Sequence, residues 1–212
     1  MRLLPTLSVA SVLALSVCFS PLQAAQGEAT GAEPNLREIS AWIRSVETVQ
    51  SRFQQYNFDG SISHGMIYIS RPGRMRMEYD DADALVQVSG GTVAIWDGAR
   101  AKSAQKYPLM KTPLWNLLRE DVDLGRPGAI KAFDHYRDLT RITAYDPDAP
   151  QAGRIVFEFD NSKGQIALDG WKTRTATGQS TTVRLRDPEY GIPLSDFLFS
   201  IQHEEQRRNS DR

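Results

Sequence analysis

The sequence is poor in the side chains that most soluble enzymes use for chemistry. It has one cysteine, Cys18, and three histidines, none of which stands in a metal-binding spacing such as HExxH or in a nucleophile elbow. Asp80, Asp81 and Asp83 follow a predicted strand, but acids in that position are typical of a solvated turn. We therefore expect no catalytic residue, no metal site and no cofactor, and a hydrolase is the weakest interpretation.

The chain also lacks a surplus of positive charge. It carries 25 lysines and arginines against 26 aspartates and glutamates, whereas a protein that binds nucleic acid needs a basic face that displaces counterions. A nucleic-acid partner is therefore not expected. No internal repeat is evident, and the about 190 residues after the N-terminal segment suffice for one domain.

The N-terminal segment has the pattern of a secretory signal peptide. Arg2 gives it a positive start, residues 7–19 are apolar, and the small residues up to Ala25 offer a cleavage site. The apolar run is shorter than the ~20 residues that a membrane-spanning helix needs. We expect a signal peptide over residues 1–24, a flexible lead-in over residues 25–34 and export to the periplasm.

Cys18 leaves a second reading of this segment open. A cysteine at the end of an apolar run can be the lipidation site of a bacterial lipoprotein, but such sites prefer glycine, alanine or serine before the cysteine, and here Val17 precedes it. Ordinary cleavage near Ala24 is therefore favoured, with a lipid anchor as the alternative. The mature chain would then contain no cysteine and no disulfide.

One helix is predicted at the start of the mature domain. Asn35 can cap it while Glu38 reaches back to the Asn35 backbone, the arrangement of a capping box. The apolar positions recur at helical spacing, at Leu36, Ile39, Ile43 and Val46, with Trp42 beside them. This stripe predicts a helix packed on a sheet.

After Glu47 the pattern becomes alternating, with turn signals every eight to thirteen residues or so. The clearest strands are TVAIWD, RIVFEFD, GQIALDGWKTRTAT and STTVRLRD, and they predict an antiparallel meander that could form a sandwich or a barrel. KTPLWNLLRED, residues 111–121, interrupts the strands as a short helix that Thr112 would cap and Pro113 would begin. AIKAFDHY, residues 129–136, is predicted as a second short helix.

The stretch HGMIYISRPGRMRMEYD, residues 64–80, combines two different strands. Met66 and Tyr68 share one face of the first strand, and Ile67 and Ile69 share the other, so this strand is apolar on both faces. Such a strand usually lies between two layers. The second strand, residues 74–79, alternates apolar and charged side chains, and three methionines within twelve residues indicate a deformable apolar lining.

At this point the sequence resembles a known family, the periplasmic outer-membrane lipoprotein carriers of the LolA type. The resemblance is carried by GMIYISRPGRMRMEY, LVQVSGGTVAIWD, PLMKTPLWNLL, GQIALDGWKTRTATGQSTTVRLRD and FLFSI. These segments span nearly the whole mature chain in the family's order. Gly65 to Pro72 matches the family's glycine, hydrophobic strand and Arg-Pro junction, and Thr112-Pro113-Leu114 matches the start of its lid helix.

The resemblance implies a mainly β fold with an α-helical lid. This is an unclosed antiparallel β-barrel, a strongly curved sheet that the N-terminal helix and the short central helices cover. The carrier domain would extend over residues 35–201, followed by a polar C-terminal tail over residues 202–212. The implied partners are acylated lipoproteins, an inner-membrane ABC transporter that releases them and an anchored outer-membrane acceptor, and a shuttle of this kind works as a monomer.

The resemblance also implies the site residues. The arginine that matches Arg71 locks the lid in the family by hydrogen bonding to lid backbone. The candidates for an acyl-chain cavity are Met66, Tyr68, Met75, Met77, Tyr79, Leu85, Val88, Ile95, Trp96, Leu114, Trp115, Leu117 and Leu118; ordinary core packing is the alternative for these side chains.

The sequence departs from the family at two places. The position of Met75 is commonly a bulky aromatic residue in the family, and the C-terminal DFLFSIQHEEQRRNSDR lacks the proline-rich closing turn. Two other functions share the same fold, namely a lipid-anchored outer-membrane acceptor and a periplasmic sensor of acylated ligands. An acceptor would carry lipid on Cys18.

Overall fold

The computed structural model describes residues 35–98 and 101–210. The predicted signal peptide, Cys18 within it, and the lead-in over residues 25–34 lie outside this part of the chain. None of the helices in the described ranges is long and apolar enough to cross a membrane.

The first helix, α1 (Leu36–Ser45), begins where the sequence predicts it. The Asn35 side chain accepts hydrogen bonds from the backbone nitrogens of Arg37 and Glu38, both at 3.0 Å, and the Glu38 carboxylate accepts from the Asn35 nitrogen at 3.0 Å. This capping box supplies acceptors to otherwise unpaired donors at the helix start. The apolar stripe of α1 buries Ile39 and Ile43 against the sheet.

Eleven antiparallel strands form the sheet in the described residues. They are β1 (Thr48–Tyr56), β2 (Ile62–Ser70), β3 (Arg74–Tyr79), β4 (Leu85–Ser89), β5 (Thr92–Trp96), β6 (Gln105–Pro108), β7 (Ile130–Tyr136), β8 (Leu139–Ala144), β9 (Arg154–Asp160), β10 (Ala167–Arg174) and β11 (Ser180–Tyr190). The four clearest predicted strands are β5, β9, β10 and β11, which confirms those predictions.

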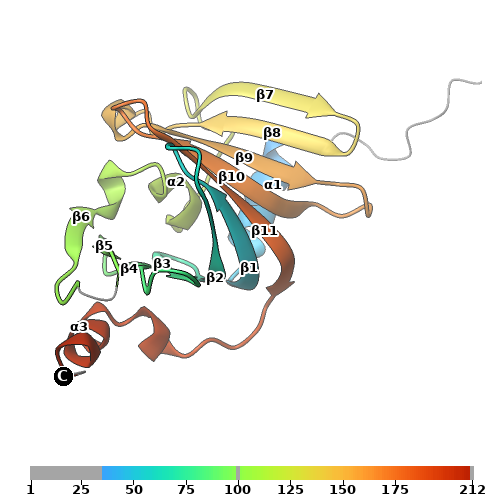
Figure 1. Cartoon of the computed structure of the whole chain (residues 1–212). Coiled ribbons are helices and arrows are strands. Elements are labelled where there is room, and N and C mark those ends of the chain that lie inside the picture. Colours follow the sequence, from blue (N-terminus) through green and yellow to red (C-terminus); the bar gives the residue numbers. More distant parts are fainter. Residues whose placement is uncertain (1–34, 99–100, 211–212) are drawn as a thin grey trace, which may run out of the picture. The chain divides into compact units, whose positions relative to one another are not determined.

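The sheet curves strongly but does not close. Its strand order is β6-β5-β4-β3-β2-β1-β11-β10-β9-β8-β7, so β6 and β7 are edges that do not pair with each other. In Figure 1 the two halves of the sheet bend around α1 and α2. The predicted unclosed antiparallel barrel with helices over its open side is confirmed.

The central helix is shorter than predicted. A 3₁₀ turn, η1 (Leu109–Lys111), precedes α2 (Trp115–Leu118), which spans four residues. The Thr112 hydroxyl donates to the Leu109 carbonyl oxygen at 2.8 Å, so it does not cap α2 as predicted. Instead, turn hydrogen bonds from Trp115 to Thr112 and from Asn116 to Pro113 lead into the helix.

The predicted helix over residues 129–136 is wrong, because this segment forms the edge strand β7. It pairs with β8, for example Phe133 with Ile142 and His135 with Thr140, and a turn at Arg137 joins the two strands. Ile130 and Phe133 stand three residues apart, which resembles a helical stripe. The pairing partner that stabilises the strand lies outside the segment, so the local pattern is overridden.

The C-terminal residues return across the opposite side of the sheet. A 3₁₀ turn, η3 (Asp196–Phe199), is followed by α3 (Ile201–Ser210). The turn contacts β3 and β4, and α3 contacts β4 and pairs its Glu204 with Arg76 of β3. A further 3₁₀ turn, η2 (Pro150–Ala152), precedes β9. The segment predicted as a polar tail is thus polar in composition and largely helical.

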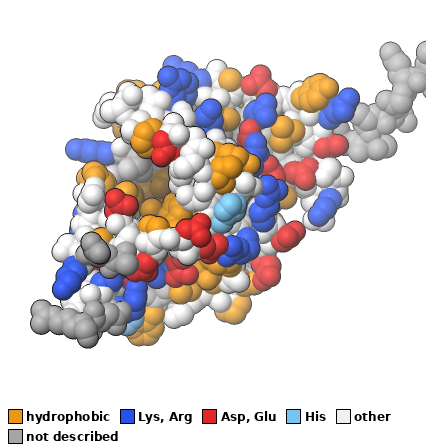
Figure 2. Space-filling model, viewed as in Figure 1, with side chains coloured by type: hydrophobic (Ala, Val, Ile, Leu, Met, Phe, Trp, Pro, Cys, Tyr) orange, Lys and Arg blue, Asp and Glu red, His pale blue; other side chains and the backbone are white. Residues whose placement is uncertain are grey.

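Two groups of buried apolar side chains lie on the two sides of the sheet. The large group lies on the concave side, between the sheet, α1 and α2; the small one comprises Leu85, Ala94 and Trp96, with Ile201 of α3 packed against it. Figure 2 shows hydrophobic side chains on the floor of a recess, within a face that otherwise carries charges of both signs.

Candidate functional site

The concave side of the sheet is lined by alternate residues of neighbouring strands. Ile67 lies opposite Met77, and Ile69 lies opposite Met75, across the β2–β3 pair. Because side chains alternate between the faces of a strand, these four residues share one face. All four are buried in the large core.

Most of the predicted cavity residues belong to this concave core. Met75, Met77, Val88, Leu117 and Leu118 are buried in it, and Tyr79, Ile95, Leu114 and Trp115 are partly buried and packed against it. The structure therefore brings together strand and lid-helix residues that are up to 43 positions apart in the sequence, from Met75 to Leu118.

Met66 and Tyr68 do not lie in this core. They lie opposite Glu78 and Arg76 on the convex side, and both are only partly buried. Both faces of β2 are apolar, so the sequence pattern alone does not say which face is inward. The concave positions of this strand are occupied by Ile67 and Ile69, which the prediction left out.

Leu85 and Trp96 also lie on the convex side. They lie opposite each other across the β4–β5 pair and are buried beneath the C-terminal segment, with Ile201 against them. The helix that covers them is polar, so its sequence gives no sign that it shields an apolar surface. The concave positions of these two strands are instead Val86, Val88, Val93 and Ile95.

Further core residues come from the C-terminal half of the sheet. They were not among the predicted site residues, although they alternate within clear strand patterns: Phe157, Phe159, Trp171, Val183 and Leu185. The alternation was a usable signal for the inward face of β9 and β11. The resemblance drew attention to other segments, so these strands supplied no predicted site residue.

A small apolar cavity lies between α1 and the sheet. Its volume is about 20 Å³, and its lining is formed by Trp42, Ile43, Val46, Val49, Ile69, Arg71, Leu117, Phe157, Leu168 and Tyr190. Pockets that hold small molecules usually have volumes of about 300–1,000 Å³. At this place the protein's own side chains leave little free space, and room for a fatty chain here requires α1 or α2 to move.

Arg71 is the polar residue at the edge of this cavity. It donates hydrogen bonds to the carbonyl oxygen of Ile43, in the last turn of α1, and to that of Arg119, at the C-terminal end of α2, the latter at 2.5 Å. Carbonyls at helix C-termini lack partners within the helix and carry partial negative charge. The guanidinium thus joins the ends of both lid helices to the sheet.

The backbone around Arg71 makes further contacts with the same elements. The nitrogen of Arg71 donates to the Glu47 oxygen at 2.7 Å, and the nitrogen of Gly73 donates to the Leu118 oxygen at 2.8 Å. A turn of three residues between β2 and β3 therefore contacts the C-terminal ends of α1 and α2. We call residues 71–73 the latch turn.

The charge of Arg71 is poorly compensated. Burial, and to a lesser degree the nearby positive charge of Arg44, lowers the pKa of Arg71, and no ion pair of Arg71 is present in the described residues. Its Nε atom is buried and has no hydrogen-bond partner. Neutral carbonyl oxygens thus hold a partly buried cation that has no carboxylate partner in the described residues.

Aromatic side chains connect α1 to the C-terminal half of the sheet. The Trp42 ring meets the ring of Phe159 edge to face at 5.7 Å and that of Tyr190 at 5.8 Å. Such pairs are worth roughly 0.5–1.5 kcal/mol beyond the area they bury. Burial raises the pKa of Tyr190, so its hydroxyl is neutral at physiological pH.

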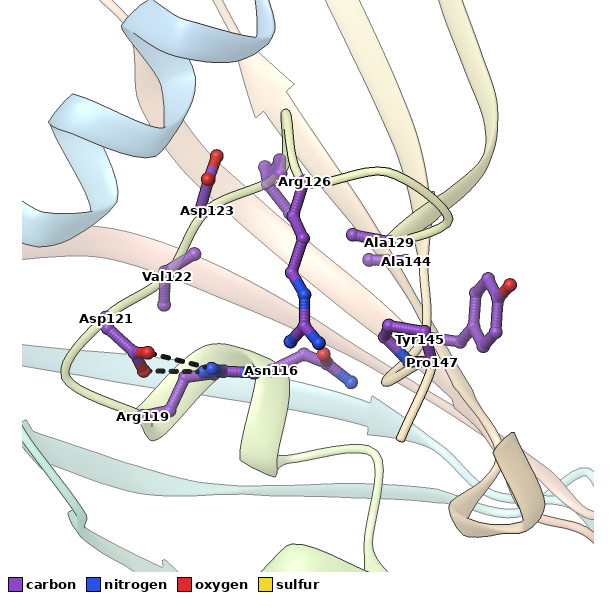
Figure 3. A pocket seen from close by; sticks show the side chains of 11 residues that line it. Asn116, Arg119, Asp121, Val122, Asp123, Arg126, Ala129, Ala144, Tyr145 and Pro147 are labelled. Atoms are coloured by element: carbon purple, nitrogen blue, oxygen red, sulfur yellow. Dashed lines mark hydrogen bonds and ion pairs between the residues drawn. The ribbon is translucent and has the colours of Figure 1, made fainter. Parts of the chain in front are cut away.

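Figure 3 shows a different pocket, of about 390 Å³, behind α2. The Arg119 guanidinium forms a two-point ion pair with Asp121 there, at 2.8 and 2.9 Å, and Arg126 pairs with Asp148 at 2.9 Å. Arg126 and Asn116 point into the space. This charged lining does not suit a hydrocarbon chain.

The described residues contain no group of three potential metal ligands. The arrangement instead offers an apolar interior, a cover of two helices and one arginine that holds both.

Comparisons with known proteins place this arrangement in a known group. The family model described as outer membrane lipoprotein carrier protein LolA matches residues 44–202. The outer-membrane lipoprotein carrier protein of Coxiella burnetii, from three strains, is 30% identical over 99 residues, which cover 44% of each chain. The matched region thus spans less than half the length of these curated relatives.

Solved structures give more distant likenesses. A putative outer membrane lipoprotein-sorting protein domain from Vibrio parahaemolyticus has a TM-score of 0.48 and 8% identity, covering 80% of this chain and 97% of that one. A LolA superfamily protein from Nitrosomonas europaea has a TM-score of 0.40 and 8% identity, covering 79% and 98%.

Proposed function

The chain belongs to the LolA family of outer membrane lipoprotein carrier proteins, and on that premise we propose that it is a periplasmic carrier of lipoproteins. It buries the acyl chains of lipoproteins released from the inner membrane and delivers them to an outer-membrane acceptor. An inner-membrane ABC transporter loads it, and it works as a monomer. The observation that best supports this proposal is the pair of hydrogen bonds by which Arg71 joins α1 and α2 above an apolar interior.

The cargo makes such a carrier necessary. Each methylene of an acyl chain gains about 0.8 kcal/mol in an apolar phase, so a lipoprotein with two or three chains loses on the order of tens of kcal/mol on entering water. The periplasm supplies no ATP for this step. A carrier must therefore replace the membrane's apolar phase with its own interior.

The hydrogen bonds of Arg71 explain how a filled interior could accept this cargo. Hydrogen bonds to a charged group contribute roughly 1.5–3 kcal/mol each, so the two bonds of Arg71 cost only a few kcal/mol to break. The burial of an acyl chain lowers the free energy by more than this amount. The empty protein is thus closed by weak polar contacts, and the cargo itself opens it.

The opened space would be lined by the concave core. Met75 and Met77 offer unbranched, adaptable side chains, while Leu117 and Leu118 leave the interior with α2 as it moves. Once cargo leaves, the lid carbonyls can return to Arg71. The same contacts therefore favour release to an acceptor that binds the chains more tightly.

Native mass spectrometry of the protein purified from a periplasmic extract tests the proposal. We expect a population that carries the mass of a tri- or diacylated lipoprotein, and a mature N-terminus near Ala25. A protein that carries no acylated cargo, and that also fails to bind a triacylated peptide added in excess, would contradict it. An acylated Cys18 would instead identify an anchored acceptor.

A further inference from the structure

A groove of about 460 Å³ runs along the C-terminal end of α1. One wall is formed by α1 and the residues after it, including Trp42 and Val46, and the other by the β9–β10 connection and the start of β10, including Lys163 and Ile166. Trp42, Val46 and Ile166 pack against the large core and are only partly buried. The groove thus has a mainly apolar floor that is open to water, with Glu47 and Lys163 also in its lining.

The groove adjoins the small internal cavity. Trp42, Val46 and Tyr190 line both spaces. The two spaces differ greatly in volume, about 460 Å³ outside and about 20 Å³ inside. A chain that lies in the groove would therefore be separated from the interior by a boundary of three side chains.

Trp42 is the part of this boundary that can move with the lid. It belongs to α1, while its edge-to-face partners Phe159 and Tyr190 belong to the sheet. Arg71 holds the carbonyl oxygen of Ile43, the next residue along α1. Release of that bond frees the segment of α1 that carries Trp42.

Other large spaces are less suited to a hydrocarbon chain. A pocket of about 490 Å³ on the other side of the β9–β10 connection includes Asp160, Asp169, Asp187 and Glu189 in its lining. The pocket of Figure 3 is lined by ion pairs. Burial of an apolar chain beside such charges removes them from water without compensation.

We propose that this groove is the entry route of the acyl chain, and that Trp42 is its gate. The proposal rests on the proposed function, because it names where the cargo of that function enters. The occupant is a single saturated acyl chain, which lies first in the groove and then passes between Trp42 and Tyr190 when α1 moves. Each chain of a multiply acylated cargo uses the same route in turn.

A route has a kinetic signature that a binding site lacks. A change that affects the route alone alters the association and dissociation rates by the same factor, and the equilibrium constant stays constant. The test uses stopped-flow fluorescence with the full mature chain and dansyl-labelled undecanoic acid; dissociation is measured by transfer to excess lipid vesicles. The variants are Trp42→Ala, which opens the gate, and Ile166→Arg, which places a charge in the groove.

We expect Trp42→Ala to raise the association rate at least fivefold; because Trp42 also lines the internal cavity, its equilibrium constant is not used. We expect Ile166→Arg to lower both rates at least fivefold, with an equilibrium constant within twofold of the unaltered protein. The control Ile62→Arg makes the same change at an exposed position on the β1–β2 hairpin and should leave both rates within twofold. Far-UV circular dichroism checks folding, and Ile166→Gln replaces the arginine variant if that variant does not fold.

Unchanged rates in both variants would overturn the route. So would a changed equilibrium constant with an unchanged association rate, because the groove would then be part of the binding site. If the unaltered protein binds neither the probe nor a triacylated peptide, the proposed function fails and the route fails with it. If the unaltered protein binds the probe but the two variants show its rates unchanged, the proposed function stands and only the route through the groove is wrong.

Discussion

The Nη2 atom of Arg71 lies 2.5 Å from the carbonyl oxygen of Arg119, the residue that ends α2. Nη1 of the same guanidinium bonds the Ile43 carbonyl oxygen in α1. One side chain, directly after β2, is therefore hydrogen-bonded to both helices that cover the concave side of the sheet. In the carrier that we propose, Arg71 would be the point at which cargo binding and lid movement are coupled.

Replacement of this arginine should loosen the lid. Arg71→Leu removes two charge-assisted hydrogen bonds, and their loss should raise the opening constant of α1 and α2 about tenfold or more. Hydrogen–deuterium exchange should show faster exchange over residues 39–46 and 115–119, and transfer of lipoprotein to the acceptor should change with it.

Arg52→Leu is a matched control for this prediction. Arg52 is exposed on the convex side, where it pairs with Asp80, and surface pairs of this kind contribute about 0–1 kcal/mol. Its exchange pattern over the two lid helices should equal that of the unaltered protein. If exchange over the two helices in Arg71→Leu also equals that of the unaltered protein, Arg71 does not hold the lid closed.

Much of the fold could be predicted from the sequence, because the decisive signals were local. The capping box at Asn35 and the turn-bounded strands each depend on neighbouring residues, so α1 and most strands appear where expected. β7 could not be predicted in this way. Its stability comes from pairing with β8, and its own residues are spaced like a helix.

The candidate site was predicted less completely. The faces of β2 are both apolar, so the pattern did not distinguish Met66 and Tyr68 from the concave Ile67 and Ile69. Trp96 is a large apolar side chain of the kind that lines a cavity, but α3, a polar helix far along the chain, covers it. Only the three-dimensional arrangement shows which apolar side chains face the lid.

Gly65 is expected to tolerate no side chain. A Cβ atom there would lie 1.9 Å from the carbonyl oxygen of Glu78 and 2.7 Å from the Phe53 ring. Gly65→Ala should therefore lower the free energy of unfolding by about 2–4 kcal/mol, in the range of overpacked or strained cores. Urea unfolding measures this directly.

Gly125→Ala provides the comparison for Gly65. The nearest atom to a Cβ at Gly125 is the carboxylate oxygen of Asp123, at 3.3 Å, an exposed side chain that can move aside. Its free energy of unfolding should stay within about 0.5 kcal/mol of the unaltered value. Equal effects of the two substitutions would show that the close approach at Gly65 is not a constraint.

Stability at acid pH should depend on Glu204, which anchors α3 to the convex side. Burial raises its pKa, but hydrogen bonds from Arg207 and Arg208 and the charge of Arg76 lower it more, so that the pKa is about 2. A folded pKa below the unfolded value means that the ionised carboxylate stabilises the fold above pH ~4.5. That contribution is lost as the pH falls from about 4.5 towards 2.

Glu204→Gln cannot make this change, so it isolates the effect. Between pH 6 and pH 3 the unaltered protein should lose about 1 kcal/mol more unfolding free energy than the variant, a modest figure because Arg207 is partly open to water. Urea unfolding at the two pH values gives both numbers. A difference that stays constant with pH would show that Glu204 does not titrate with folding.

Acyl contact from the concave methionines tests the central claim most directly. Photo-methionine, which is close to methionine in size, can replace every methionine. In the described residues Met75 and Met77 are concave, while Met66 is convex and Met110 is exposed. After irradiation with a bound, isotope-labelled lipoprotein, mass spectrometry should find acyl adducts on Met75 and Met77 and only background on the other two. If bound cargo forms acyl adducts on Met66 or Met110 as strongly as on Met75 and Met77, or forms none on Met75 and Met77, the interior is not filled by acyl chains.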